Sequence, residues 1–342
     1  MPIFVRQGRS RTKYMSGFID ANGQVVVPPI YDHADPFRNG RGSVRRGELW
    51  GAVDEAGDLI IPPRFGGPLV FNEGFSEFSL PGDRCGVVDL MGDVVIPARF
   101  RSVSHFSSGI ACVRSGELYG FIDEHGREVI PPFFEDARAF SEGLAAAKLG
   151  GKWGYINLDG SIAIAPQFIC ERGMAGPFRQ GLARVAKDGR WGHINKDAEF
   201  VVDPKFDMAF EFSEGLAEVR VGRRSGFVNI SGELVVDTIY IHVRAFSEGL
   251  AQVNVGTGEA HKSIAAACEV GFINKTGDIT ISPQFFSAGR FHRGHCLVTT
   301  EKRIGYINHS GNFVWSDGWV EMLRMDPHHL FPPEGLEEGR LA

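Results

Sequence analysis

Apolar and polar residues alternate along this chain in short stretches, and the alternation returns about every 34 residues. The stretch "LAAAKLGGKWGYINLDG" (144–160) shows one cycle, in which two alternating runs flank a polar, glycine-containing tip. Alternation of this kind is typical of β-strands with one buried face. Only "SIAAAC" (263–268) has a helical period, and it is too short to establish a helix. The pattern therefore predicts many short strands.

A seven-residue core marks each cycle: Gly, two apolar residues, Asp or Asn, two variable residues and Gly. A glycine-rich stretch of this kind resembles a phosphate-binding loop, but a ligand-binding loop normally occurs only once in a chain. Here the motif recurs, which makes it part of the fold. The copies are residues 17–23, 51–57, 86–92, 120–126, 154–160, 192–198, 226–232, 271–277 and 305–311.

Two further elements accompany the core. An apolar run that usually ends in proline follows it, as in "EVIPPFF" (128–134), and a stretch such as "FSEGLAAAK" (140–148) comes next. Asp or Asn with a later Gly fits a tight reversal, and Pro ends a strand or places it at a sheet edge. Each unit is therefore predicted to be a three- or four-stranded antiparallel meander, with "FEDARAF" (134–140) as the weak fourth strand.

One meander cannot bury both of its faces, whereas stacked copies cover one another. We therefore predict an all-β tandem array of nine repeats over residues 1–315 and a non-repeat C-terminal segment, 316–342, that forms a cap or a tail. Four short strands per repeat would make a propeller blade, and a propeller-like ring is slightly favoured. An open β-solenoid, or superhelix, is the alternative.

The Trp–Gly dipeptides at 50–51, 153–154 and 191–192, together with "YINxxG" and "FSEGLAxV", resemble the WG-repeat family of bacterial proteins. Other copies depart from it, since Tyr119 replaces the tryptophan and Ala198 replaces the closing glycine. The resemblance implies a β-repeat scaffold with binding roles, and it supplies no catalytic residues. Trp50, Trp153 and Trp191 are expected to be structural, and copies that lack the consensus residues are expected to be looser.

Composition narrows the setting of the protein. Hydrophobic residues make up 43% of the 342 residues and charged residues 23%, which suits a protein with a packed core. No apolar run approaches the length of a membrane span, and the N-terminal "MPIFVRQGRSRTK" has no apolar signal region. The five cysteines are widely spaced and form no CxxC pair. These features lead us to expect a cytoplasmic protein with free thiols.

Two stretches deserve testing as chemical sites. "GTGEAHKS" (256–263) has the spacing of a phosphate-binding loop, but His261 stands where the second glycine belongs. His292 and His295 lie close together, yet a metal site needs three or four converging ligands. The sequence therefore predicts no enzyme, cofactor or metal, and a nucleotide-using enzyme built on 256–263 is the alternative.

The tips that precede the Trp–Gly positions are basic, although the formal net charge of the chain is −6. Equivalent tips of a repeat array line one edge. Such an edge would dock an acidic surface of another protein, or a polyanion or glycan as the alternative; the charges could also serve only to solvate hairpin ends. Nucleic acid is disfavoured because aromatic residues do not interleave with the charges. The candidate partner-binding residues are Arg6, Arg9, Arg11, Arg45, Arg46, Lys152, Arg190, Arg223, Arg224 and Arg303.

Overall fold

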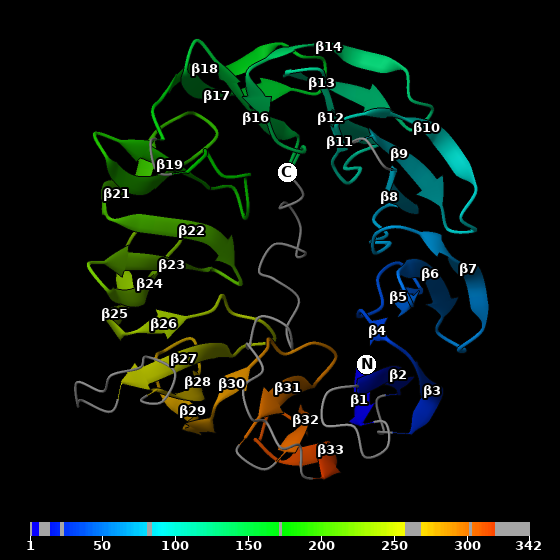
Figure 1. Ribbon diagram of the computed structural model, residues 1–342. Helices are drawn as coiled ribbons and strands as arrows, with labels where there is room; N and C mark the ends of the chain where they lie inside the picture. Colours follow the sequence, from blue (N-terminus) through cyan, green and yellow to red (C-terminus); the bar gives the residue numbers. More distant parts are fainter. Residues whose placement is uncertain are drawn as a thin grey trace. The chain divides into compact units, whose positions relative to one another are not determined.

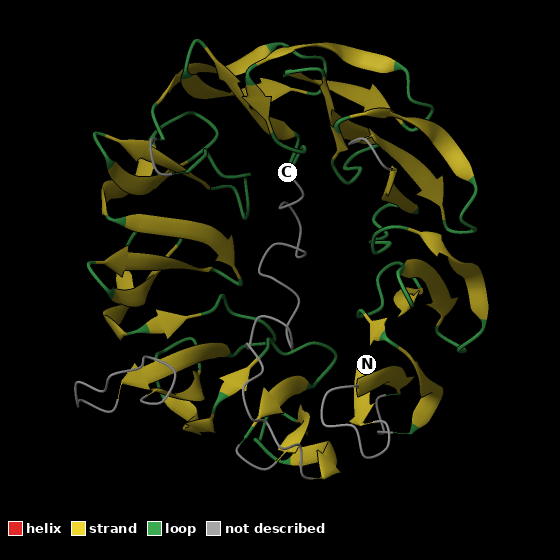
Figure 2. Cartoon of the chain, in the orientation of Figure 1, coloured by secondary structure: helices red, strands yellow, loops and turns green. Residues whose placement is uncertain are grey.

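A computed structural model describes residues 2–6, 14–20, 24–80, 84–170, 173–256, 268–300 and 303–318. These residues form 33 strands and no helix (Figures 1 and 2). They divide after Pro166 into two compact units. No helix among the described residues is long and apolar enough to span a membrane. The all-β prediction is therefore confirmed for the described residues.

The first unit contains the strands from β1 to β17 and most of β18, which extends past the division. Its strands are β1 (Pro2–Arg6), β2 (Tyr14–Ile19), β3 (Val25–Tyr31), β4 (His33–Ala34), β5 (Arg41–Arg46), β6 (Leu49–Asp54), β7 (Leu59–Phe65), β8 (Phe75–Leu80), β9 (Arg84–Asp89), β10 (Val94–Phe100), β11 (Ser102–Val103), β12 (Ile110–Ser115), β13 (Leu118–Asp123), β14 (Glu128–Phe134), β15 (Asp136–Ala137), β16 (Leu144–Leu149), β17 (Lys152–Asn157) and β18 (Ile162–Phe168).

The second unit contains the remaining strands. They are β19 (Ala183–Lys187), β20 (Arg190–Ile194), β21 (Phe200–Phe206), β22 (Met208–Ser213), β23 (Leu216–Val221), β24 (Arg224–Asn229), β25 (Leu234–Tyr240), β26 (His242–Val243), β27 (Ala251–Gly256), β28 (Cys268–Ile273), β29 (Ile279–Phe285), β30 (Ser287–Ala288), β31 (Cys296–Thr299), β32 (Arg303–Ile307) and β33 (Phe313–Gly318).

Each sheet is an antiparallel meander of three or four consecutive strands, such as β4-β5-β6-β7, and the described residues form nine such sheets. The predicted weak fourth strand is present, since Asp136 pairs with Lys148 and Ala137 with Ala147. In a β-solenoid, strands of successive repeats would pair into continuous sheets. Here the strands pair only within their own sheet, as in propeller blades. The fold is therefore of the β-propeller class, as predicted in preference to the solenoid.

The glycine of the Trp–Gly pair leaves room for the backbone of the next strand. A Cβ added to Gly154 would lie 2.5 Å from the carbonyl oxygen of Ile164, and one added to Gly51 would lie 2.2 Å from that of Ile61. In the same region the pairing register shifts, because Trp50 faces Phe65 whereas the second residue after it faces Ile61. The returning strand bulges over the glycine, where a proline without an N–H is tolerated.

Asp or Asn fixes the turn that follows. Asp54 Oδ1 accepts hydrogen bonds from the N–H of Ala56 at 3.0 Å and of Asp58 at 2.9 Å, and Gly57 closes the turn with a φ of +95°. A left-handed φ of this kind favours glycine. Ala198 holds a φ of 65° at the equivalent place and keeps the turn bond from its N–H to Asn195 O at 3.1 Å. The turn therefore survives without its glycine.

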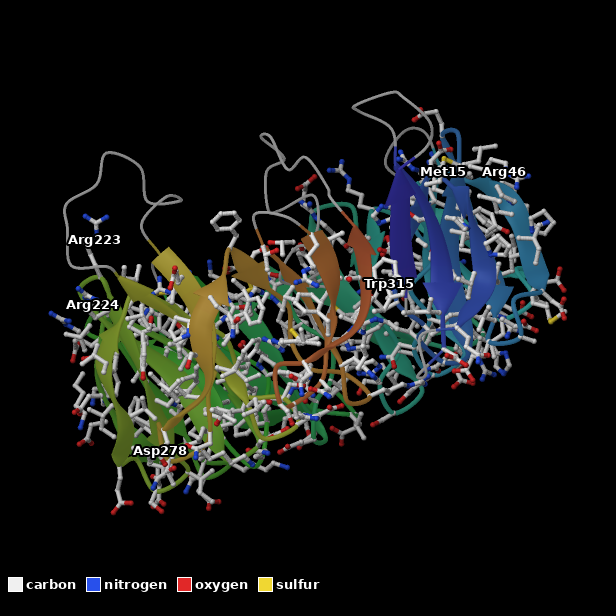
Figure 3. The ribbon with its side chains drawn as sticks, turned by 90° about the horizontal axis from the view of Figure 1, so that it is seen from below. Met15, Arg46, Arg223, Arg224, Asp278 and Trp315 are labelled. Atoms are coloured by element: carbon white, nitrogen blue, oxygen red, sulfur yellow. The ribbon has the colours of Figure 1, made fainter. Side chains whose placement is uncertain are left out.

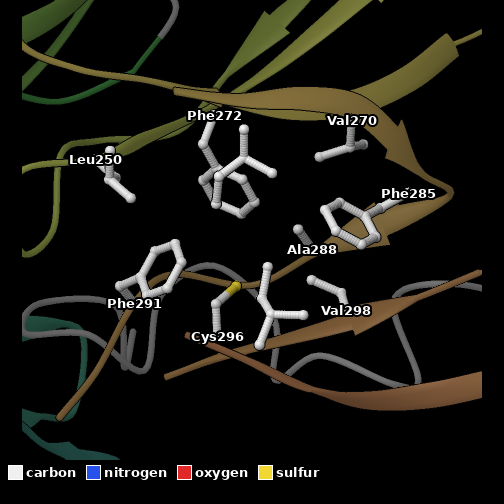
Figure 4. Packing of buried hydrophobic residues seen from close by; sticks show 10 residues of the cluster. Leu250, Val270, Phe272, Phe285, Ala288, Phe291, Cys296 and Val298 are labelled. Carbon is white, nitrogen blue, oxygen red and sulfur yellow. The ribbon is translucent and has the colours of Figure 1, made fainter. Parts of the chain in front are cut away.

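The hydrophobic core lies between neighbouring sheets. Figure 4 shows one cluster in the second unit, where Phe272 and Phe285 from one sheet meet Phe291, Cys296 and Val298 of the next segment and sheet. Burial raises the pKa of the Cys296 thiol to about 12. Cys85, Cys112, Cys170 and Cys296 are all buried, and none forms a disulfide with a described residue.

Candidate functional site

The recurrent "SEG" turns connect neighbouring sheets. Glu214 and Glu248 hold left-handed backbone conformations, and each carboxylate accepts a hydrogen bond from the glycine N–H of the next such turn, at 2.9 Å to Gly249 and to Gly294. Gln180 does the same to Gly215 at 2.7 Å. In the first unit, Asn39 and Glu73 make equivalent bonds one repeat ahead. These side chains form what we call the turn relay.

Electrostatics reinforce the turn relay. Lys275, in the Asn-x-x-Gly turn of the next sheet, lies 3.2 Å from the Glu214 carboxylate. Partial burial alone would raise the pKa of Glu214, but hydrogen bonds from the Gly249 N–H and from Lys275 outweigh it and hold that pKa below its usual value. These recurrent carboxylates therefore have structural partners.

The basic tips occupy the opposite ends of the hairpins from the Asx turns. Within the second unit, Figure 3 shows Arg223 and Arg224 at one end of the strands and Asp278 at the other. Hydrogen bonds from Thr276 and Asn274 lower the pKa of Asp278. Each unit therefore presents chemically different loops at its two ends.

The structure places the ten predicted partner-binding residues unequally. Arg9 and Arg11 lie outside the described residues, and Arg6 lies in β1, where only the backbone is described. Lys152 and Arg223 are exposed, and their side chains make no hydrogen bond or ion pair with any described residue. Arg46 is exposed and lies 5.5 Å from the centre of the Tyr31 ring.

The other four candidates have partners within the fold. Arg190 forms an ion pair with Asp207, and Arg224 donates a hydrogen bond to the carbonyl oxygen of Ile239 at 2.7 Å. Arg45 is half-buried and lies over the Trp50 ring. Arg303 lies over the ring of Phe313 at 4.4 Å. These side chains are less available to a partner than their sequence pattern suggested.

The tryptophans differ in burial. Trp153 and Trp191 are 3% and 2% exposed, and Trp50 is only partly buried. Arg138 lies over the Trp153 ring at 5.7 Å and Arg184 over the Trp191 ring at 5.3 Å. The two buried rings contribute packing, while Trp50 is partly exposed.

The comparison with protein families accounts for this recurrent geometry. The model of the WG containing repeat matches eight segments, which are residues 17–50, 50–80, 86–119, 119–153, 153–191, 191–223, 226–256 and 271–302. The chain belongs to the WG-repeat family. The predicted membership is therefore confirmed, and the matches begin or end repeatedly at the Trp–Gly position.

Several solved structures are similar to these WG repeats at low sequence identity. A eukaryotic initiation factor has a TM-score of 0.57 at 10% identity, over 82% of this chain and 85% of that one. BamB from Moraxella catarrhalis has a TM-score of 0.47 at 10% identity, with 82% and 94% covered. Hsv2 from "Kluyvelomyces marxianus" has 0.42 at 12% identity, with 63% and 84% covered. Among curated proteins, none matches the sequence.

Acidic residues that the sequence pattern did not reveal lie against the tips of the WG repeats. Asp32 accepts a hydrogen bond from the N–H of Gly47 at 2.7 Å, and Asp207 accepts one from that of Gly222 at 2.6 Å. Both acids follow the last strand of the preceding repeat. They come within reach of the tip glycines only when the chain folds. Their signal in the sequence is an acid directly after "IY" or "KF". The tip surface is therefore less positive than its basic residues suggest.

Aliphatic residues at the tips were also missed. Leu49, Leu80, Leu149 and Val221 are exposed, at 45%, 50%, 38% and 47%. Each lies directly across the hairpin from a cation, and the pairs are Arg46 with Leu49, Leu80 with Arg84, Leu149 with Lys152, and Val221 with Arg224. The apolar stem of the cation can pack on the aliphatic neighbour. In the sequence, their signal was a Leu or Val within two residues of the tip glycine. We call these four the aliphatic–cation pairs.

A buried polar cluster lies between two sheets of the second unit. Arg184 is 6% exposed and lies 3.0 Å from the Glu211 carboxylate. His193 is fully buried, and its Nε2 lies 2.7 Å from the carbonyl oxygen of Phe210, which requires a proton on Nε2. Burial, with a smaller contribution from the Arg184 charge, lowers the pKa of His193 to about 4. A neutral histidine therefore fills a core position.

The structure describes only part of the two stretches considered as chemical sites. Residues 257–263 of the loop-like "GTGEAHKS" lie outside the described residues. His292 and His295 face each other across a turn, with Arg293 and Gly294 in left-handed conformations. Across the described parts of the chain, no group of three or more His, Cys, Asp or Glu could hold a metal ion. The tips thus remain the candidate site.

Proposed function

We propose that this WG-repeat protein is a non-catalytic scaffold that binds another protein through its tips. The aliphatic–cation pairs support this proposal most directly. Protein interfaces combine apolar contact at their centre with polar and charged groups around it. Tips on which Leu49 stands beside Arg46, or Val221 beside Arg224, present both kinds of group. The partner surface would be apolar with acidic residues.

Binding of a polyanion or glycan is the second candidate, supported by the exposed side chains of Lys152 and Arg223. Polyanion binding depends chiefly on cations and weakens steeply with salt. The exposed aliphatic residues would add little to it, and Asp32 and Asp207 beside the tip glycines would oppose it. These features favour the protein partner. The proposal places the scaffold in the cytoplasm, where its buried cysteines would stay reduced.

The test is a pull-down from the native host, with Leu80→Ser compared against Met91→Ser. Both residues are exposed aliphatic side chains of the same sheet, at 50% and 59%, but Leu80 lies at the tip and Met91 in the turn at the other end. We expect Leu80→Ser and Arg223→Gln to reduce capture of the partner, and Met91→Ser to leave it unchanged. Equal capture by all variants would exclude the tips as the docking surface.

Salt separates the two candidates. A protein partner held by apolar contact should remain bound to the wild-type chain as ionic strength rises, although more weakly. Loss of all binding in moderate salt, with Leu80→Ser indistinguishable from the wild type, would instead identify a polyanion.

A further inference from the structure

The last strands of the sheets differ in one respect that concerns pairing with other chains. A last strand has an unpaired edge, and proline blocks such an edge because it has no N–H to donate. Among the eight seven-residue last strands, proline occurs at the fourth or fifth position in β3, β7, β10, β14, β18, β21 and β29. In β25 these positions are Asp237 and Thr238. β25 therefore lacks the block that the other seven share.

β25 is also rich in exposed aliphatic residues. Its outward face carries Val235, Asp237 and Ile239, while Val236 and Tyr240 are buried. Ile239 is 60% exposed, more than any other large hydrophobic side chain of the described residues. No other described strand pairs with the free edge of β25, which is the last in the order β22-β23-β24-β25. An edge with this composition is suited to receive another strand.

The charges along β25 determine which partner segment would pair with its free edge. Asp237 stands between the two outward aliphatic residues, so a strand laid beside β25 needs a basic residue opposite it. Arg224 donates to the Ile239 carbonyl oxygen, which places a guanidinium at the end of β25 next to the tip. An acidic residue at that end of an added strand would meet the exposed Arg223 and the N–H groups of Arg224 that do not bind Ile239.

We propose that β25 is a strand-addition site for an extended segment of a partner protein. The segment has apolar residues at alternating positions, a basic residue between them and an acidic residue at the end beside Arg224. This inference rests on the proposed function, because it names the part of the scaffold that would hold a partner chain. It adds main-chain pairing to the side-chain contacts of the tips.

A second copy of this chain fits β25 less well. If two copies of β25 paired antiparallel about their centres, Asp237 would face Asp237, and like charges directly opposite destabilise a sheet. A basic residue from a different protein avoids this repulsion. The charge pattern of β25 therefore favours a heterologous strand.

The test uses the full chain and the fluorescently labelled peptide Glu-Thr-Val-Thr-Lys-Thr-Val-Thr, with binding followed by fluorescence anisotropy. Thr238→Pro gives β25 the Val-Val-Asp-Pro sequence that β21 already has around Pro204, so the change suits this fold. Ile239→Ser removes an exposed side chain and leaves the core intact. A peptide with Lys and Glu exchanged is the control for charge.

We expect saturable binding to the wild type and a dissociation constant at least about tenfold larger for Thr238→Pro and Ile239→Ser, with unchanged melting temperatures. The exchanged peptide should also bind more weakly. No binding to the wild type, or equal binding by Thr238→Pro, would overturn the inference. Dimerisation of the wild type that Thr238→Pro abolishes would overturn it as well, because a second copy would then be the occupant.

The result of the peptide experiment can be distinguished from the result of the pull-down that tests the tips. If the peptide fails to bind while Leu80→Ser reduces capture from lysate, only the β25 site is wrong. If the peptide binds β25 while the Leu80 and Arg223 variants capture normally, the tip proposal is wrong and the strand-addition site stands.

Discussion

Ala198 holds a backbone conformation that suits glycine better. Its φ of 65° is left-handed, and a side chain in that region costs about 1–2 kcal/mol. We expect Ala198→Gly to raise the free energy of unfolding by about 0.5–1 kcal/mol, because the gain in the folded state exceeds the extra freedom of the unfolded chain. Urea denaturation measures the change.

Gly160→Ala is the matched reverse change. Gly160 has a φ of +84°, and its added Cβ would lie 3.3 Å from Ile130. The free energy of unfolding should therefore fall. An unchanged value in both variants would mean that the closing glycine is not needed for the turn.

Trp153 tests the packing of the Trp–Gly strand. Its side chain is 3% exposed, so Trp153→Ala should lower the free energy of unfolding by roughly 3–5 kcal/mol. Trp50→Ala should cost less, because Trp50 is only partly buried. Thermal melting compares the two. Equal, small effects would show that neither ring supports the core.

His193 gives stability a pH dependence. Its folded pKa of about 4 lies below the ordinary value of 6.5, so the unfolded chain binds the proton more tightly between these pH values. Stability is therefore complete above pH 6.5 and falls as the pH drops towards 4. From about pH 7 to pH 5 the loss from this group is about 2 kcal/mol.

His193→Phe should remove that part of the pH dependence. Phe121 and Phe227 occupy the equivalent position in other repeats, so a phenyl ring suits the site. Denaturation curves at about pH 7 and pH 5 give the comparison with the wild type. Parallel losses in both proteins would assign the acid sensitivity to other groups.

At the scale of elements, the turn relay joins one sheet to the next. Glu214→Ala removes the acceptor of the Gly249 N–H and the partner of Lys275, and should cost about 1–2 kcal/mol. Glu214→Gln should retain most of the stability, because Gln180 already makes the same bond to Gly215 in this chain. Thermal melting of the two variants decides whether the amide suffices. If Gln destabilises as much as Ala, the charge rather than the hydrogen bond is what matters.

At the scale of the whole molecule, the sequence predicted the features that depend on neighbours along the chain. The repeat, its strands and the turn glycines follow from local alternation and backbone geometry. The bond from Gly249 to Glu214 and the approach of Asp207 to Gly222 join residues 35 and 15 positions apart, so folding alone brings them together. Counting charges along the sequence therefore overstated the basic character of the tips.

The C-terminal segment tests how the array ends. The sequence predicts that residues 316–342 form a cap or a tail, but residues 319–342 lie outside the described residues, and β33 extends to Gly318. A chain that ends at Gly318 should melt at a lower temperature or aggregate, because repeat arrays need their final apolar face covered. Unchanged melting and solubility, measured by light scattering during a thermal ramp, would show that the segment is a tail.

The turn relay also bears on how such a protein can change its length. Gln180, Glu214 and Glu248 each contact the turn of the adjacent repeat. Duplication or loss of one repeat within the second unit would rebuild the same junction from the same residue types. We therefore expect the gene to tolerate gain or loss of whole repeats within such a run, while changes of a few residues inside a turn break a junction.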